Sequence, residues 1–200
     1  MTVTAIQEQT KKRSKIIFDS GESIVLYKGE LSRYGIGIDR EISAAAHEEI
    51  MNVLLPKRAK LRAMNLLKAR PYTVKGLRDK LEEGGYPGSV IDIAIEYVSS
   101  YGYLDDLKYA EDFIYTYREK KSRKRIAAEL AGKGISKQII NSAMEENNDG
   151  DLESFESEQI KHFLEKKGFF AADLSYEDKA KIKASLYRKG YDPYLIDRYI

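Results

Sequence analysis

The sequence has no cysteine and no tryptophan, and only four prolines and two histidines among its 200 residues. Without cysteine there can be no disulfide, thiolate metal site or cysteine nucleophile, which suits a reducing cytosol. Residues 1–5 lack a basic region followed by an apolar stretch, so no secretory signal is expected. No apolar run approaches the roughly 18 residues that span a bilayer. These absences predict a soluble, cytoplasmic protein with no membrane partner.

Groups that could carry catalysis are equally scarce. His47 and His162 are far apart in the sequence, and neither has a serine nucleophile or a metal ligand at helical spacing, so both are expected on helix surfaces. Gly35-Ile36-Gly37 lacks the third glycine of a dinucleotide site and is interpreted as a loop. We therefore expect no catalytic residue, no cofactor and no metal, and predict that the protein is not an enzyme.

Two adjacent carboxylates leave one alternative open. Asp105 and Asp106 could together hold Mg²⁺, or one of them could cap a helix and stabilise its positive end. The cap is the simpler interpretation.

One helical pattern occurs three times. Two apolar residues four positions apart are followed by a glycine and then by three further apolar residues. The copies are Leu77, Leu81, Gly85, Val90, Ile91, Ile95; Ile126, Leu130, Gly134, Ile139, Ile140, Met144; and Ile182, Leu186, Gly190, Leu195, Ile196, Ile200. The pattern is typical of a short amphipathic helix that ends on a left-handed glycine, with a second helix packed on it. Successive copies lie 49 and then 56 residues apart, which indicates a repeat protein.

Another helix precedes each pair, so each repeat should hold three helices. The predicted repeats cover residues 56–104, 105–149 and 150–200. In the first, a helix lined by Leu61, Met64, Leu66 and Leu67 should end at Pro71. Thr73, Ser122 and Asp178 each stand four residues before the first apolar position of a copy and are expected to cap those helices.

Residues 1–55 follow a different pattern. Segments 3–8, 14–19 and 22–27 are rich in Val, Ile, Phe and Tyr and predict a β-meander, with Ser20-Gly21 as a two-residue hairpin turn. A helix capped by Ser43 should cover the sheet with Ile42, Ala46, Ile50 and Val53, and Pro56 should interrupt it. The predicted fold class is thus mostly α: three tandem three-helix repeats in a curved array, preceded by a small β-meander plus helix.

Basic residues offer the strongest candidate site. The four segments 1–55, 56–104, 105–148 and 149–200 carry net charges of −1, +4, +1 and −2. A dense cluster straddles a predicted helix start, with only Glu119 and Glu129 as nearby acids, so an anionic partner would relieve its self-repulsion. The predicted partner-binding or DNA-binding residues are Arg118, Lys120, Lys121, Arg123, Lys124, Arg125, Arg70 and Lys75. A solvated helix face is the alternative.

Tyrosine is also frequent, with 15 residues. Most rings are expected to cover helix junctions, and exposed ones could stack on bases or anchor a protein partner.

Three sets of residues resemble those of the RecX family, whose members regulate the RecA recombinase. The first is Leu77, Leu81 and Gly85; the second is Gly102-Tyr103-Leu104-Asp105-Asp106 leading into Tyr109-Ala110; the third is Ile126, Glu129, Leu130, Lys133, Gly134 and Ile135. The resemblance covers residues 57–200. It departs at Lys121-Ser122, where many relatives have Lys-Gly, and the leader at 1–55 belongs to only some relatives.

The resemblance implies a monomeric, non-catalytic protein that binds in the groove of a RecA filament on single-stranded DNA, with weak affinity for that DNA alone. It further implies inhibition of RecA's ATP hydrolysis and strand exchange, in recombination, DNA repair and the SOS response. A general DNA-binding helical protein or a non-catalytic adaptor would use the same surfaces, and these alternatives stay open.

Overall fold

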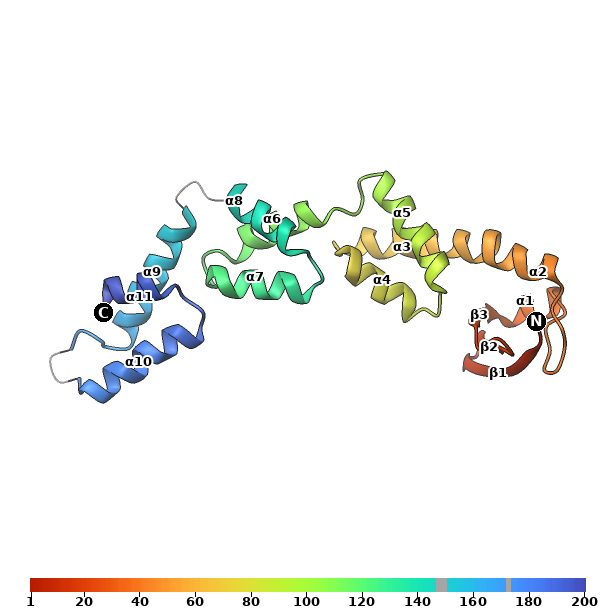
Figure 1. The fold of residues 1–200 in the computed structure, drawn as a ribbon, viewed down its shortest axis with the longest axis horizontal. Helices are drawn as coiled ribbons and strands as arrows, with labels where there is room; N and C mark the ends of the chain where they lie inside the picture. The colour runs from red at the N-terminus through yellow and green to blue at the C-terminus, as the bar shows by residue number, and fades with distance from the viewer. Residues whose placement is uncertain (147–150, 172–173) are drawn as a thin grey trace. The chain divides into compact units, whose positions relative to one another are not determined.

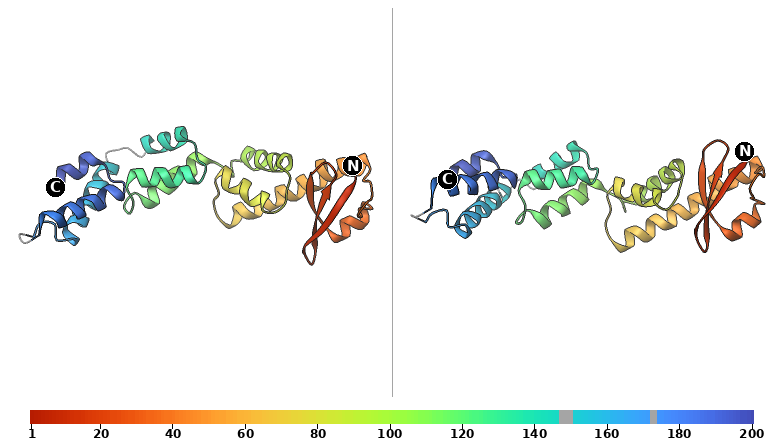
Figure 2. Two further views of the ribbon diagram at one scale, coloured as in Figure 1. Left: turned by 60° about the horizontal axis from the view of Figure 1, so that its bottom comes forward. Right: turned by 90° about the horizontal axis from the view of Figure 1, so that it is seen from below.

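The computed structural model describes residues 1–146, 151–171 and 174–200, with only the backbone for 151–153. The chain forms two compact units, residues 1–104 and 105–200, and each is described by itself. The ribbon views show the sheet at the N-terminal end of the first unit and helices elsewhere (Figures 1 and 2).

The sheet is an antiparallel meander in the order β1 (Val3–Thr10), β2 (Arg13–Phe18) and β3 (Ser23–Tyr27). The predicted meander is confirmed, but the two-residue turn is wrong. The Phe18 amide donates to the Glu22 carbonyl, so residues 19–21 form a three-residue loop with Gly21 at a φ of +83°. A glycine in the left-handed region is what such a three-residue hairpin loop requires.

A long helical stretch follows the short helix α1 (Lys28–Arg33). It consists of α2 (Ala44–Glu49), the π-helix η1 (Ile50–Leu54) and α3 (Leu55–Ala69). The Ser43 hydroxyl accepts a hydrogen bond from the Ala46 amide, as a cap should. Pro56 does not interrupt the helix, contrary to prediction, because the wider π turn before it accommodates the proline ring.

The π turn also changes which side chains face the core. Ile42 and Ile50 are buried as predicted, whereas Val53 is 60% exposed, and Leu55 is buried in its place. Leu61 and Met64 are likewise exposed, contrary to prediction. The buried stripe of α3 runs through Leu55, Ala59 and Ala63 at four-residue intervals, which places Leu61 and Met64 outside it.

The first unit has one continuous core. Phe18 and Leu26 of the sheet belong to the same buried cluster as Leu77 and Leu81 of α4 (Val74–Glu82) and Val90 of α5 (Gly88–Ser100). A sheet of three strands is only marginally stable alone. The leader and the first three-helix module therefore fold on each other.

The second unit contains two further three-helix modules, each with its own buried cluster. The first comprises α6 (Asp106–Tyr117), α7 (Arg123–Gly132) and α8 (Lys137–Glu146). The second comprises α9 (Asp151–Lys166), α10 (Tyr176–Arg188) and α11 (Pro193–Tyr199). The predicted class, a mostly α chain with three three-helix modules after a small sheet, is confirmed.

The repeat landmarks are mostly where the sequence predicts them. Gly85, Gly134 and Gly190 end their helices at φ values of +81°, +85° and +80°. Thr73 and Ser122 cap α4 and α7. The predicted cap at Asp178 is wrong, because the Ser175 hydroxyl accepts from the Asp178 amide at 3.1 Å and α10 begins three residues earlier. Asp178 still stabilises the positive end of the helix from its first turn.

None of the helices in the described part of the chain combines the length and the apolar character needed to cross a membrane.

Candidate nucleic-acid interface

Six of the eight predicted site residues lie together at the start of α7. Arg118 ends α6, Lys120 and Lys121 lie in the link, and Arg123, Lys124 and Arg125 form the first turn of α7. This turn is held in place by the buried Ser122. Its hydroxyl accepts from the Arg125 amide at 3.3 Å and donates to the carbonyl of Lys189, at the end of α10, at 2.9 Å.

Two of the six cations are neutralised locally, which the sequence analysis did not predict. The carboxylate of Glu129, in the second turn of α7, accepts from Lys121 Nζ at 2.6 Å and from Arg125 Nε at 3.2 Å. Lys121 Nζ also lies 3.8 Å from the centre of the Tyr117 ring. The hydrogen bond from Lys121, supported by the one from Arg125, holds the pKa of Glu129 below its ordinary value.

Arg118 joins the two modules of the second unit. Its guanidinium carbon lies 4.4 Å from the centre of the Tyr115 ring and 4.9 Å from that of Phe155 in α9. Its carbonyl accepts a hydrogen bond from the Gln159 amide nitrogen at 2.7 Å, and the Gln159 oxygen accepts from the Tyr191 hydroxyl at 2.9 Å. Burial raises the pKa of Tyr191, with a further contribution from Glu156, so this hydroxyl remains a donor.

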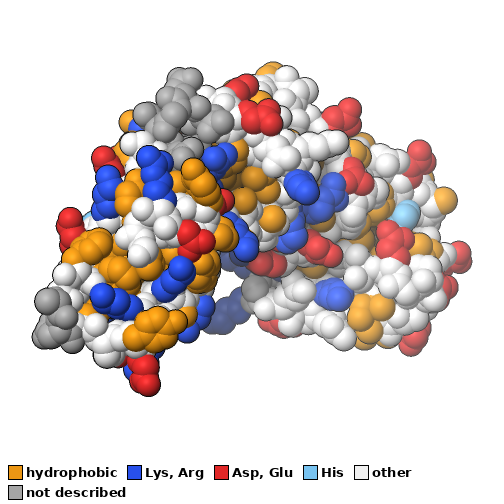
Figure 3. Space-filling model, turned by 60° about the vertical axis from the view of Figure 1, so that its left-hand side comes forward, with side chains coloured by type: hydrophobic (Ala, Val, Ile, Leu, Met, Phe, Trp, Pro, Cys, Tyr) orange, Lys and Arg blue, Asp and Glu red, His pale blue; other side chains and the backbone are white. Residues whose placement is uncertain are grey.

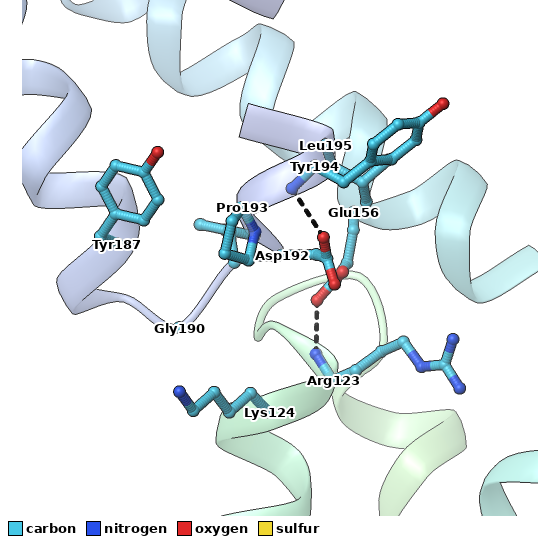
Figure 4. Close-up of a pocket in the computed structure, with 10 residues that line it drawn as sticks. Arg123, Lys124, Glu156, Tyr187, Gly190, Asp192, Pro193, Tyr194 and Leu195 are labelled. Carbon is cyan, nitrogen blue, oxygen red and sulfur yellow. Dashed lines mark hydrogen bonds between the residues drawn. The ribbon is translucent and has the colours of Figure 1, made fainter. Parts of the chain in front are cut away.

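A buried carboxylate occupies the start of α7. Glu156 is 4% exposed, and its Oε1 accepts from the Arg123 backbone amide at 2.6 Å (Figure 4). This contact uses the Arg123 backbone and not its guanidinium. Within the described residues, no carboxylate lies within 4.0 Å of the charged groups of Arg118, Lys120, Arg123 or Lys124. These four residues are therefore the uncompensated part of the cluster.

An open groove of about 820 Å³ lies beside this turn. Arg123 and Lys124 line one side. The segment from Gly190 to Leu195, which links α10 to α11 and includes the start of α11, lines the other side together with Tyr187 (Figure 4). Sequence reasoning missed the groove, because its second wall comes from the third module. The basic cluster, which contributes Arg123 and Lys124, and the frequency of tyrosine were the signals that pointed toward it.

The remaining two predicted residues lie in the first unit. Arg70 ends α3 and its guanidinium carbon is 4.6 Å from the centre of the Tyr72 ring. Lys75 Nζ pairs with Asp79 Oδ2 at 2.7 Å. The structure therefore gathers six of the eight residues and leaves these two in a separate compact unit.

Tyrosine rings show both predicted environments. Tyr72, Tyr109 and Tyr117 are half-buried at helix junctions, whereas Tyr101, Tyr103 and Tyr115 are exposed. On the face of the second unit shown in Figure 3, Lys and Arg side chains lie among hydrophobic ones. Cations next to apolar and aromatic surface can contact both phosphates and bases.

The carboxylates of Asp105 and Asp106 lie at the start of α6. Asp105 caps α6, accepting from the Leu107 and Lys108 amides at 2.9 and 3.0 Å. In the described parts of the chain, no group of three or more His, Cys, Asp or Glu side chains is placed to hold a metal ion. His162 is exposed as predicted, but His47 is half-buried and its ring makes a T-shaped contact with that of Phe18.

Comparison with known families gives three adjacent matches. Residues 59–97, 105–144 and 155–200 match the first, second and third three-helix domains of RecX. Each match falls on one of the three helical modules.

Curated relatives are similar over almost the whole chain. A protein called regulatory protein RecX from Caldanaerobacter subterraneus subsp. tengcongensis is 29% identical over 194 residues, covering 96% of this chain and 94% of the relative. A protein of the same name from Clostridium perfringens is 29% identical over 201 residues, covering 96% and 90%. One from Listeria monocytogenes is 27% identical and covers 96% and 71%.

Two solved structures share the fold. The crystal structure of a regulatory protein RecX superposes with a TM-score of 0.65 at 16% identity, covering 98% of this chain and 97% of the other. That of RecX from Lactobacillus salivarius gives 0.62 at 24% identity and covers 72% and 93%.

Proposed function

Because the chain belongs to the RecX family, we propose that it is a regulator that binds the RecA filament on single-stranded DNA and lowers RecA's ATP hydrolysis and strand exchange. The curated relatives are named as regulatory proteins, which supports a role in control. In this proposal the protein acts in the cytoplasm as a monomer, by binding and without catalysis, in recombination, DNA repair and the SOS response.

One observation carries the proposal. Arg118, Lys120, Arg123 and Lys124 gather at one helix junction without a carboxylate partner among the described residues, on a chain made of RecX modules. Uncompensated cations attract a polyanion and speed its association. We assign the main contact with the filament to these four residues.

The other predicted residues have smaller roles in this proposal. Lys121 and Arg125 share Glu129, so their charge is partly offset before a partner arrives. Lys75 is offset in the same way by Asp79, and Arg70 is stacked on Tyr72. These four residues add to the positive electrostatic field and help to orient the protein on its partner. They contribute less to the affinity for the filament than the four uncompensated cations do.

The test is the rate of ATP hydrolysis by RecA on single-stranded DNA, measured with increasing amounts of this protein. We expect the rate to fall and to saturate at a stoichiometric excess over RecA. An unchanged rate at saturating protein, together with tight binding to bare duplex, would instead identify a general DNA-binding protein. On a duplex, log K should then fall by about 0.9 per log unit of salt for each phosphate contacted.

A further inference from the structure

The groove in the second unit has the size of a ligand site. Its volume of about 820 Å³ lies in the upper part of the roughly 300–1,000 Å³ range of ligand pockets. One wall is the first turn of α7, and the other is the link between α10 and α11 together with the first turn of α11. It is therefore built by two modules of the same compact unit.

The two acids of the groove are occupied by backbone groups. Glu156 Oε1 accepts from the Arg123 amide at 2.6 Å, and Asp192 Oδ1 accepts from the Tyr194 amide at 2.8 Å (Figure 4). Amides at helix starts carry partial positive charge, which offsets these carboxylates. The charge left available to a ligand is that of the Arg123 guanidinium and the Lys124 ammonium.

Two exposed tyrosines, Tyr187 and Tyr194, line the same groove as these cations. In Figure 4, Lys124 and Arg123 lie below the loop at Gly190, Tyr187 lies to its left, and Tyr194 extends from the start of α11 at the upper right. Tyr194 is 72% exposed, and no ring contact involves it within the described residues. Tyr187 is also exposed, and its hydroxyl donates to Asp197 Oδ1 at 3.2 Å, which fixes the ring.

The spacing between cations and rings is set by the backbone. The Ser122 hydroxyl donates to the Lys189 carbonyl at 2.9 Å, next to Gly190. A Cβ on Gly190 would lie 3.2 Å from Ser122 Oγ and 3.6 Å from the Cβ of Lys124, so the loop approaches α7 closely because residue 190 is glycine. The groove is therefore formed before any ligand arrives.

We propose that this groove binds a short segment of single-stranded nucleic acid, with phosphates at Arg123 and Lys124 and a base stacked on Tyr194. Stacking on aromatic side chains combined with a basic track is how single strands are bound without sequence preference. A duplex keeps its bases inside the helix, and an acidic peptide has no base to stack. The inference rests on the proposed function, since it specifies which component of the RecA–DNA filament enters the groove.

The test compares two oligonucleotides of equal length in the absence of RecA. Fluorescence anisotropy with the full chain at low salt measures the affinity for labelled oligo(dT) and for an abasic strand that keeps the phosphates. We expect Tyr194→Ala to weaken oligo(dT) binding about fivefold or more, the range of one base–aromatic stack, and to leave abasic binding unchanged. Tyr176→Ala is the matched control, because Tyr176 is 88% exposed in the same unit outside the groove.

The cations give a second readout. The pair of changes Arg123→Gln and Lys124→Gln should lower the slope of log K against log salt by about 1.4, since each phosphate contact to a single strand contributes about 0.7. Lys166→Gln with Lys167→Gln removes the same charge from two exposed, adjacent lysines at the end of α9 and should leave affinity and slope unchanged. Circular dichroism confirms that each variant is folded.

Three results would overturn the inference: equal binding of oligo(dT) and the abasic strand by the parent, an equal loss on both strands in Tyr194→Ala, or preferential binding of polyglutamate. RecA ATP hydrolysis, measured separately with the parent, distinguishes the two proposals. If RecA is unaffected while Tyr194→Ala selectively loses oligo(dT) binding, the proposed function fails and the groove assignment stands. If RecA is inhibited while Tyr194→Ala binds as the parent does, only the groove assignment fails.

Discussion

Gly85 and Gly190 end equivalent helices at nearly the same φ, yet they contact different neighbours in the two units. A Cβ on Gly85 would lie 2.3 Å from Cγ2 of Val25 in β3. One on Gly190 would lie 3.2 Å from the hydroxyl of Ser122, at the start of α7. In the first and third modules, the glycine end therefore lies against a neighbouring element. The β leader supplies it to the first module, and the second module supplies it to the third.

The largest loss of stability should come from adding a Cβ at the tighter of these two contacts, that between Gly85 and Val25. Gly85→Ala adds left-handed strain of about 1–2 kcal/mol and an overlap with Val25 that costs about 1–3 kcal/mol more. Gly190→Ala adds the same strain, but its nearest neighbour, the Ser122 hydroxyl, would lie at 3.2 Å, so it should cost about 1–2 kcal/mol. Urea unfolding, assigned to each unit by hydrogen exchange of its peptides, measures both losses.

A second substitution tests the contact between Gly85 and Val25 directly. Val25→Ala in the Gly85→Ala background should recover part of the loss, because it removes the methyl group that the new Cβ would meet. An equal loss of stability for the two glycine substitutions, with no recovery in the Val25→Ala background, would show that Val25 does not lie against Gly85.

The next effect concerns serine caps in the two units. Ser122→Ala removes both the cap of α7 and the hydrogen bond to Lys189, and should cost about 2 kcal/mol. Ser43→Ala removes only the cap of α2 and should cost about 1 kcal/mol. Chemical denaturation midpoints give the difference. If Ser43→Ala proved the more costly, the contact between the second and third modules would contribute little.

The smallest effect is a pH dependence specific to the second unit. Because Lys121 and Arg125 depress the pKa of Glu129, its ionised form stabilises the folded state. That stabilisation is complete above the ordinary glutamate pKa of about 4.5 and is lost as the pH falls through the lower folded value. Glu129→Gln should therefore lower the melting temperature at pH 7, and the deficit should shrink as the pH falls below the ordinary glutamate pKa. A deficit that does not change with pH would assign the effect to packing.

Local features of the fold could be predicted from the sequence. The caps at Ser43, Thr73 and Ser122 and the glycine at 85 depend on interactions within one turn, which residue type and spacing encode. The exposed Val53 could not be predicted, because the π turn that rotates it away from the core is a response to Pro56 and to tertiary packing.

The site was predictable only in part, for the same reason. The density of Arg and Lys between 118 and 125 is a local signal, and the structure gathers those residues. Glu129, eight residues after Lys121, determines which of these cations remain uncompensated. The second wall of the groove comes from residues 187–195. The groove depends on how the second and third modules pack on one another, whereas the Arg125–Glu129 pair is an i,i+4 contact within one helix.

In the proposed function, the uncompensated cations at the start of α7 carry the affinity for the RecA filament. The most direct measurement compares the affinity of two full-length variants for a RecA–single-stranded DNA filament: Arg123→Gln with Lys124→Gln, and Lys166→Gln with Lys167→Gln. Both lose two positive charges from the second unit, and the second pair lies about 15 Å from Glu156 along α9. We predict about a tenfold or greater loss, or at least about 1.4 kcal/mol, for the first pair and less than about twofold for the second. Equal losses in the two variants would show that net charge, and not this surface, determines binding.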